Sequence, residues 1–249
     1  MLIDDAAAAQ ANSRIVACIP ARLGSTRLPG KPLQRVGGVA LVVRVHAAVR
    51  RALSDIPSAR VVVVTDDDRI EDVAASAGAE VWRHDAACTS GTQRILRAVT
   101  ARGLSVDALL NVQGDQPFVT AAHLRPLLKA LDAGAPIATL CAPLAPADRA
   151  RPERVKVVRD ALGRALYFSR AAIPGALHVG VYGFRGEVLS RLAALPRAPL
   201  ADAEDLEQLD WLHAGLPVQV AEFPDPLLSI DTPEDLATAE AWLAAAGNP

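Results

Sequence analysis

Short apolar segments alternate with helix-length amphipathic segments through the first 145 residues, and this alternation restricts the chain to a small number of folds. Strands and helices in alternation predict an α/β fold whose sheet is mostly parallel and carries helices on both faces. In such a sheet, ligands bind beyond the carboxyl ends of the strands. The predicted strands are 14–20, 60–66, 79–83, 107–115 and 136–144. The predicted helices are 39–53, 68–78, 92–103 and 120–134.

The pattern changes after Pro146, where three shorter strand segments follow one another without long helices between them. These segments predict a small β-rich extension that makes the Rossmann-like sheet a mixed one. No internal repeat or low-complexity linker divides the chain, so we expect one domain over residues 1–249, with regions 14–145, 146–222 and 223–249. The later elements are strands at 154–160, 165–173, 178–185 and 217–223, and helices at 201–215 and from Thr232 onward.

Overall charge and cysteine content exclude several classes of protein. A net charge of −2 gives no general attraction to nucleic acid, so any cationic site is local. Three scattered cysteines without CxxC spacing argue against a disulfide framework or a zinc site and fit a reducing cytoplasm. Residues 1–13 are acidic with too short an apolar run for a signal peptide, and no segment of ~18 apolar residues follows. We therefore expect a frayed N-terminal tail, a cytoplasmic location, and neither nucleic acid nor a membrane as partner.

The loop after the first predicted strand concentrates positive charge and small residues. Segment 21–33 contains Arg22, Arg27 and Lys31 together with two glycines and two prolines. Glycine permits close backbone approach, proline stiffens the loop and the cations neutralise phosphates, so this composition suits a polyphosphate-binding loop. A solvated basic turn has the same composition, and both interpretations stay open. The loop is not a P-loop, because five residues separate its glycines and Pro32 follows Lys31, and no GxGxxG motif is present.

Carboxylates follow two other predicted strands. Gln113 and Asp115 come just past Leu109 and Leu110, the buried part of the predicted strand 107–115, and Asp231 ends a strand-like segment immediately before the last helix. Two carboxylates that face a cationic loop are understandable if Mg²⁺ bridges them to bound phosphates. An aspartate before Thr-Pro is also commonly a helix N-cap, which is the alternative for Asp231. The acidic segment 66–68 begins a predicted helix, and helix capping is its favoured interpretation.

A series of longer segments occurs in one order along the chain. They are "IPARLGSTRLPGKPL", "TD" at Thr65 and Asp66, "SGTQR", "NVQGDQP", "VKVV", "ALYFSRAAIP", "HVGVYGFR", "LEQL" and "IDTPEDL". These segments resemble the signature segments of the CMP-Kdo synthetases (3-deoxy-manno-octulosonate cytidylyltransferases), and the resemblance covers about residues 15–240. It implies a nucleotidyltransferase-type fold and an enzyme that transfers CMP from CTP to an acidic sugar with release of pyrophosphate. It also implies Mg²⁺ as cofactor and a homodimer as the usual form.

The same resemblance assigns roles to regions and residues. Region 14–145 would bind CTP, region 146–222 would bind the acceptor and form the dimer, and region 223–249 would close the metal site. The implied nucleotide-binding residues are Ala21, Arg22, Gly24, Arg27, Lys31, Thr65, Ser90, Gly91 and Gln113, with Ser90 and Gly91 against the cytosine. The implied catalytic residues are Arg22, Lys31, Asp115 and Asp231, of which Asp115 and Asp231 would bind the metal. The implied acceptor-binding residues are Gln113, Arg170, His178, Tyr182, Glu207 and Gln208.

The implied reaction is consistent with the absence of a nucleophile motif from the sequence. Attack of an acceptor oxygen on the α-phosphorus of CTP is an in-line displacement, in which the protein positions the reactants and stabilises phosphate charge. It needs no protein nucleophile, and the sequence has no GxSxG motif. A non-catalytic CTP-binding protein is an alternative of another class, but such a protein would be expected to lose a metal-binding carboxylate, whereas both Asp115 and Asp231 are present.

Three departures from the family pattern concern the acceptor. Only Gly175, Ala176 and Leu177 separate "SRAAIP" from "HVGVYGFR", where sugar-acid enzymes of the family carry a longer segment. Gln93 and Gln116 stand where the family has acidic residues. A shorter pocket wall and less negative charge predict a small phosphonate acceptor such as phosphonoformate, as in a related branch, because a phosphonate oxygen is already anionic and needs no general base. The alternative acceptor is 3-deoxy-manno-octulosonate (Kdo), used in lipopolysaccharide synthesis.

Overall fold

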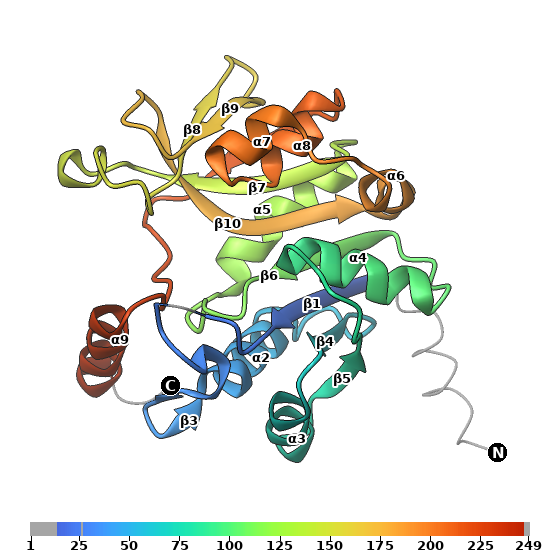
Figure 1. Ribbon diagram of the computed structural model, residues 1–249, viewed down its shortest axis with the longest axis vertical. Helices are drawn as coiled ribbons and strands as arrows, with labels where there is room; N and C mark the ends of the chain where they lie inside the picture. Colours follow the sequence, from blue (N-terminus) through green and yellow to red (C-terminus); the bar gives the residue numbers. More distant parts are fainter. Residues whose placement is uncertain (1–13, 26, 247–249) are drawn as a thin grey trace. The chain divides into compact units, whose positions relative to one another are not determined.

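The computed structural model describes residues 14–25 and 27–246, and the chain forms two compact units (Figure 1). The first unit combines the residues up to Val106 with Asn111–Ala121 and the segment from Leu227 onward, and the second combines Asp107–Leu110 with Ala122–Pro226. The expected frayed tail, residues 1–13, lies outside the described residues. The first unit contains β1 (Ile15–Ala21), η1 (Lys31–Leu33), β2 (Arg35–Val36), β3 (Val39–Ala40), α2 (Leu41–Ala52), β4 (Arg60–Thr65), α3 (Asp68–Ser76), β5 (Glu80–Arg83), α4 (Gly91–Ala101) and α9 (Pro233–Ala246).

Three parallel strands form the centre of the first unit. β1 pairs with β4 from Val16 opposite Arg60 to Ala21 opposite Thr65, and β4 pairs in parallel with β5. Helices α2 and α4 each pack on both β1 and β4. Two helices need ~8–10 Å between their axes, whereas adjacent strands are only ~4.8 Å apart, so α2 and α4 lie on opposite faces. α3 packs beside α2 on β4 and β5, which places it on the face of α2.

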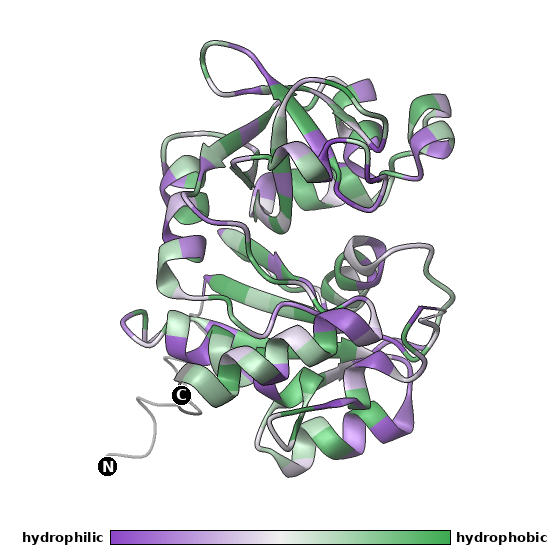
Figure 2. Ribbon diagram, turned by 90° about the vertical axis from the view of Figure 1, so that its left-hand side faces the viewer, coloured by the Kyte–Doolittle hydropathy of each residue, from purple (hydrophilic) through white to green (hydrophobic). Residues whose placement is uncertain are grey.

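Burial on both faces explains why these strands are continuously apolar. Val16–Ala21 of β1 are all buried, and Val62, Val63 and Val64 of β4 are fully inaccessible. A strand covered by helices on both sides has no solvent face, so its sequence does not alternate. In Figure 2 the strands are accordingly green over most of their length, whereas the helices alternate green and purple.

A sharp turn after β1 brings Lys31 to the start of η1. Gly30 precedes this short 3₁₀ helix with a φ of 63°, a left-handed conformation that favours glycine. Pro32 lies in the first turn of η1, where its missing N–H leaves no hydrogen bond unmade. The glycine and proline of the basic loop therefore fix the direction in which the chain presents Lys31.

The second unit contains a mixed sheet. Its elements are α5 (Ala121–Asp132), β7 (Ile137–Ala142), η2 (Pro146–Asp148), β8 (Lys156–Arg159), β9 (Ala165–Ser169), β10 (Ala176–Arg185), η3 (Gly186–Val188), α6 (Leu189–Ala193), α7 (Pro199–Glu204), α8 (Gln208–His213) and β11 (Val218–Glu222). β7 pairs in parallel with β11 and in antiparallel fashion with β10, and β10, β8 and β9 follow in antiparallel order. β6 (Ala108–Val112) contributes Ala108–Leu110 to this unit and its last two residues to the first unit. The predicted mixed α/β fold with a β-rich extension is confirmed.

Two local features of the second unit differ from regular geometry. The predicted helix 201–215 is wrong as one element, because Asp205 ends α7 in the left-handed conformation with a φ of 50° before α8 begins. The register between β10 and β7 shifts from Val179 opposite Leu140 to Tyr182 opposite Thr139. Two extra residues of β10 therefore bulge at Thr139.

The regions predicted within a single domain do not coincide with the two units. The predicted boundary after residue 145 lies inside the second unit, and the one after residue 222 lies close to the end of that unit at Pro226. The assignment of one domain with three regions stays a prediction. Within the described residues, no helix has both the length and the apolar character needed to cross a bilayer.

Candidate active site

A cavity of about 290 Å³ lies in the first unit at the carboxyl end of β1. The loop after β1, the start of α4, the segment after β6 and the segment before α9 all contribute to its wall. The residues implied by the resemblance that line it are Ala21, Arg22, Gly24, Arg27, Lys31, Gly91, Gln113, Asp115 and Asp231. Most of the predicted nucleotide-binding and catalytic residues, although distant in sequence, therefore meet around one cavity.

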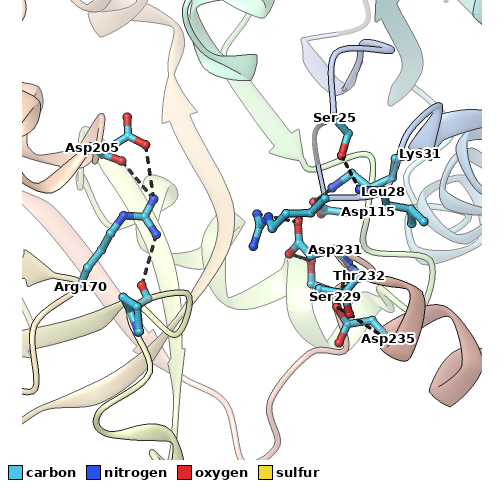
Figure 3. A network of polar contacts seen from close by, with 12 residues as sticks. Ser25, Leu28, Lys31, Asp115, Arg170, Asp205, Ser229, Asp231, Thr232 and Asp235 are labelled. Atoms are coloured by element: carbon cyan, nitrogen blue, oxygen red, sulfur yellow. Dashed lines mark hydrogen bonds and ion pairs between the residues drawn. The ribbon is translucent and has the colours of Figure 1, made fainter.

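Lys31 joins the two carboxylates of this cavity. Its Nζ lies 2.7 Å from Asp115 Oδ2 and 3.2 Å from Asp231 Oδ1, and Arg27 Nη2 lies 3.2 Å from the same Asp231 oxygen (Figure 3). Burial alone would lower the pKa of Lys31, but the two carboxylates outweigh it and raise that pKa. Burial opposes ionisation of Asp231, yet Lys31 and Arg27 lower its pKa. Lys31 and Asp231 are therefore both charged near neutral pH.

The two carboxylates that contact Lys31 Nζ could also bind a metal ion together. Oxygens of Asp115 and Asp231 that lie within 3.2 Å of the same atom can both reach one small cation. The described residues contain no group of three or more histidine, cysteine, aspartate or glutamate side chains arranged to hold a metal. Two carboxylates suit Mg²⁺, which binds few protein ligands and takes its remaining oxygens from water and substrate phosphates. The residues present thus fit the predicted metal.

A capping box at the start of α9 leaves the Asp231 side chain free for this pair. Thr232 Oγ1 accepts a hydrogen bond from Asp235 N at 3.2 Å, and Asp235 Oδ2 accepts hydrogen bonds from Thr232 N at 2.9 Å and Asp231 N at 3.0 Å. The helix N-cap that was the alternative for Asp231 is therefore provided by its neighbours. Ile230 N also donates to Asp115 O at 2.9 Å, which holds the two acidic segments side by side.

Close packing around Pro20 shapes the opposite part of the cavity. A Cβ on Gly91 would lie 2.9 Å from Pro20 Cγ, and a Cβ on Gly114 would lie 2.8 Å from Pro20 O, so larger residues would displace the backbone. Gln113 Nε2 donates to Asn111 Oδ1 at 3.2 Å, which orients the Gln113 amide. Sequence reasoning did not identify Gly114 or Asn111, and the only signal was their place within "NVQGDQP".

The residues predicted at the base-binding side are partly used for helix capping. Ser90 caps α4 by accepting a hydrogen bond from Gln93 N at 3.1 Å, and Thr65 Oγ1 accepts one from Asp67 N at 3.2 Å. Neither Ser90 nor Thr65 lines the cavity in the described part of the chain. Asp67 accepts hydrogen bonds from the first backbone amides of α3, so the predicted capping role of this acidic segment is confirmed.

Arg94 is a cavity residue that sequence reasoning missed. It is only 3% exposed, and its Nη2 donates to Asp66 Oδ2 at 2.7 Å while Nη1 donates to His84 O at 3.1 Å. This buried arginine therefore holds α4 against the residues that directly follow β4 and β5. Its only sequence signal was its position within "SGTQR".

The two glutamines that replace acidic family residues do not line the cavity. Gln93 Oε1 accepts a hydrogen bond from Thr89 N at 2.8 Å, which is a local contact at the start of α4. Gln116 is buried, and its Oε1 has no hydrogen-bond partner among the described residues. The expectation that these substitutions reduce negative charge at an acceptor therefore finds no support in the cavity.

Arg170, a predicted acceptor-binding residue, lies in the second unit and is occupied with main-chain carbonyls. Its guanidinium donates to Glu204 O at 2.9 Å, to Asp205 O at 3.2 Å and to Pro152 O at 3.3 Å, and Figure 3 shows the contact with Asp205. These contacts hold the end of α7 against the loop before β8. Binding of an acceptor by Arg170 stays a prediction.

His178, Tyr182, Glu207 and Gln208 form the rest of the predicted acceptor set, also in the second unit. Gln208 Nε2 donates to the Tyr182 hydroxyl, and the buried Gln208 Oε1 has no partner among the described residues. Burial and the nearby Glu207 raise the pKa of Tyr182, which is therefore neutral. A buried acceptor without a donor is rare in proteins and often marks a place for water or ligand.

Lys156 is a second residue that sequence reasoning left without a role. It is fully buried in β8, where its Nζ donates to Arg170 O at 2.8 Å and to Arg151 O at 3.1 Å. Burial lowers its pKa. A lysine inside the apolar run "VKVV" was the available signal.

Comparisons with known proteins agree with this arrangement. The family model described as "Cytidylyltransferase" matches residues 16–220. A 3-deoxy-manno-octulosonate cytidylyltransferase of Anaeromyxobacter sp. (strain Fw109-5) is 41% identical over 242 residues, covering 93% of this chain and 98% of the relative. A second such relative, from Burkholderia ambifaria (strain MC40-6), is 42% identical, covering 88% of this chain and 89% of the relative.

Solved structures extend the comparison to three dimensions. A CMP:2-keto-3-deoxy-manno-octonic acid synthetase in complex with CTP superposes with a TM-score of 0.85 at 35% identity, covering 94% of this chain and 99% of the other. A cytidylyltransferase of Leptospira borgpetersenii has a TM-score of 0.63 at 20% identity, over 93% of this chain and 87% of the other, and supports the fold alone.

Proposed function

Because this chain belongs to the cytidylyltransferase family, we propose that it transfers CMP from CTP to 3-deoxy-manno-octulosonate, with release of pyrophosphate. It is a CTP-dependent nucleotidyltransferase. The observation that carries the proposal is the pairing of Lys31 with Asp115 and Asp231 in a cavity lined by a basic loop, within a chain 41% identical to a named Kdo cytidylyltransferase. Support for CTP as the donor comes from the similar solved structure that contains it.

The acceptor is where this proposal departs from the sequence-based preference. The shortened connection near Gly175 favoured a small phosphonate, but the relatives compared above carry names that specify 3-deoxy-manno-octulosonate. A Cβ on Gly175 would lie 2.6 Å from Val157 O, so this connection packs directly on β8. Gln93 and Gln116, the other two reasons for a phosphonate, do not line the cavity. The alternative acceptor, Kdo, is therefore better supported than phosphonoformate.

Charge complementarity is what the chain contributes to phosphoryl chemistry. In the proposed reaction a hydroxyl oxygen of the acceptor bonds to the α-phosphorus, the bond from that phosphorus to the bridging oxygen breaks, and pyrophosphate leaves with the electron pair. The proton of the hydroxyl is released to solvent. Arg22, Arg27 and Lys31 line the cavity and would neutralise the charge of a triphosphate bound there. Lys31 is held by Asp115 and Asp231, which would limit its reorganisation during the reaction. Asp115 and Asp231 would hold Mg²⁺, which would neutralise phosphate charge and polarise the phosphoryl group.

A non-catalytic CTP-binding protein is the remaining alternative, and the same observation speaks against it. A protein that only binds nucleotide has no need for two carboxylates held against one lysine, since their charge opposes that of a triphosphate. Asp115 and Asp231 are both held in place by hydrogen bonds and by Lys31. A homodimer, as the resemblance implies, stays a prediction.

The test combines the protein with CTP, Mg²⁺ and one acceptor at a time. We expect pyrophosphate release and CMP-Kdo formation with Kdo, and much slower release with phosphonoformate, both measured by a coupled pyrophosphate assay and by chromatography of the product. Faster turnover of phosphonoformate would reverse the choice of acceptor. CTP binding without pyrophosphate release in the presence of either acceptor would leave the non-catalytic alternative.

A further inference from the structure

Thr139 of β7 faces three polar atoms with a single hydroxyl. The residue is completely buried, and its Oγ1 lies 2.9 Å from Val181 O, 3.2 Å from Val179 O and 3.0 Å from His178 Nε2. The two carbonyls belong to the bulge of β10, where the register with β7 shifts between Val179 and Tyr182. The Thr139 hydroxyl thus takes the place of a backbone donor that the bulge has removed from the ladder.

Counting protons decides which group donates to which. A threonine hydroxyl has one hydrogen, and carbonyl oxygens only accept, so the hydrogen of Thr139 is directed to the carbonyl of Val181 or Val179. A lone pair of Oγ1 then faces His178, and a contact of 3.0 Å needs a hydrogen between the two atoms. That hydrogen must be carried by Nε2. The opposite arrangement would give the Thr139 hydrogen to His178 and withdraw it from both carbonyls of a buried bulge, which is costly.

The surroundings of His178 keep its ring neutral. Phe168 lies edge-on with its ring centroid 5.0 Å away, and the Tyr182 ring lies at 5.5 Å. Burial lowers the pKa of His178 well below its ordinary value. A neutral imidazole with its proton on Nε2 has a bare lone pair on Nδ1. Nδ1 has no hydrogen-bond partner among the residues that the structure describes, and the side chain is half-buried rather than enclosed.

We propose that Thr139 is a positioning residue that holds His178 as the Nε2–H tautomer. In this tautomer Nδ1 accepts a hydrogen bond from an O–H group of the substrate that receives CMP, and it therefore favours a substrate with such a group. The assignment of the tautomer rests on the geometry of the second unit alone. The selection of an O–H group rests on the proposed function and on the predicted role of His178 in binding the acceptor.

The chemistry of the acceptor follows from the lone pair. An imidazole lone pair attracts a hydroxyl hydrogen and repels an anionic oxygen, so Nδ1 favours the hydroxyl groups of a sugar acid over the oxygens of a phosphonate. Gln208 Oε1 is also buried without a hydrogen-bond partner among the described residues, so it too would favour an O–H or N–H donor on the substrate. Two unpaired acceptors among the predicted acceptor-binding residues thus favour a substrate rich in hydroxyls.

The first arm of the test measures the tautomer in the enzyme without substrate. In protein labelled with ¹⁵N-histidine, long-range proton–nitrogen spectra distinguish a protonated Nε2 from a protonated Nδ1, and the His178→Asn variant assigns the His178 signal among the five histidines. We expect Nε2–H in wild type and in Thr139→Ser, and a mixture of tautomers in Thr139→Val. A protonated Nδ1 in wild type would overturn the proposal, as would an unchanged tautomer in Thr139→Val. If Thr139→Val does not fold, the wild-type spectrum still decides.

The second arm measures how the acceptor binds. Thr139→Val should raise the KM for Kdo about tenfold, the worth of one hydrogen bond, while the KM for CTP stays unchanged. Thr139→Ser keeps the hydroxyl and should restore the wild-type KM for Kdo. Thr100→Val, which removes another hydroxyl bonded to a carbonyl in α4, is the matched control. Equal KM values for Kdo in wild type and Thr139→Val would refute the selective role of His178.

These outcomes separate the inference from the proposed function. If wild type does not turn over Kdo, the proposed function fails, and the spectra still decide whether Thr139 sets the tautomer. If wild type turns over Kdo and carries the proton on Nδ1, the inference fails and the proposed function stands.

Discussion

At the scale of single residues, the pair of carboxylates on Lys31 has the most direct chemical consequence. Asp231 lies 3.2 Å from both Lys31 Nζ and Arg27 Nη2, so replacing it removes one charge from a compact set of three. We expect Asp231→Asn and Asp115→Asn each to lower CTP-dependent pyrophosphate release by at least about a hundredfold, because electrostatic stabilisation is lost where phosphate charge develops. Circular dichroism should show an unchanged fold.

The matched control for these substitutions is Asp72→Asn, an exposed carboxylate on α3 with the same change of charge. Its activity should equal that of wild type, since isolated surface charges contribute little. Near-normal pyrophosphate release in both Asp231→Asn and Asp115→Asn would show that the carboxylates are not part of the machinery.

Which of these residues the sequence could predict depends on the kind of signal each one leaves. Lys31 lies in the loop after one predicted strand and Asp115 at the end of another, where ligands bind in parallel sheets, and so both could be located before the structure. Gly114 and Arg94 act through contacts with Pro20 and Asp66, which are distant in the chain, and no local pattern reports such contacts. The role of the Thr139 hydroxyl could not be predicted from the sequence either, because it depends on a bulge in the neighbouring strand.

At the scale of elements, the capping box of α9 links stability to the site. Asp235 Oδ2 accepts hydrogen bonds from the backbone amides of Asp231 and Thr232, so it both starts the helix and holds the Asp231 backbone. We expect Asp235→Ala to lower the free energy of unfolding by about 1 kcal/mol, the usual worth of a cap, and also to reduce kcat. Urea titration and the pyrophosphate assay measure the two effects.

Glu234→Ala provides the comparison for this element, since Glu234 is an exposed acidic residue of the same helical turn. It should change neither kcat nor the urea midpoint by a comparable amount. A loss of stability in Asp235→Ala without any loss of kcat would mean that the cap does not position Asp231.

Two elements with clear periodicity were predicted with small errors, whereas the helix predicted over 201–215 was wrong. The predicted helix 120–134 is observed as Ala121–Asp132, and the predicted strand 79–83 as Glu80–Arg83. The predicted helix 201–215 is two helices, because Asp205 adopts a left-handed conformation. The residues next to Asp205 in the sequence do not predict this conformation. Asparagine and aspartate tolerate this conformation better than most residues, but their presence does not require it.

At the scale of the whole molecule, buried neutral histidines predict how stability depends on pH. Burial lowers the pKa values of His46, His123 and His178. Between those values and the unfolded pKa of about 6.5, the unfolded chain binds more protons than the native state, so stability falls as pH falls through 6.5. The lowered pKa of Asp231 acts in the same direction but over a lower pH range, since its stabilising contribution is present above about pH 4 and is lost as the pH falls below that value.

Urea unfolding at pH 7.5 and pH 5.5 therefore isolates the histidines. We expect a lower midpoint at pH 5.5, with a cost of up to about 1 kcal/mol for each histidine that stays neutral. The His46→Asn variant should show a smaller difference between the two pH values than wild type. Identical midpoints at both pH values for wild type would contradict the expectation.

The division of the first unit among three separate stretches of chain has a consequence for synthesis on the ribosome. The residues up to Val106 include Lys31, Asn111–Ala121 brings Asp115, and the segment from Leu227 brings Asp231. Domains generally begin to fold while the nascent chain is still growing. A nascent chain that has not reached Leu227 holds every residue of the second unit but only one of the two carboxylates that flank Lys31. The first unit is thus completed only after the whole second unit has been synthesised, and the polypeptide lacks its full set of charged groups until the segment from Leu227 has been made.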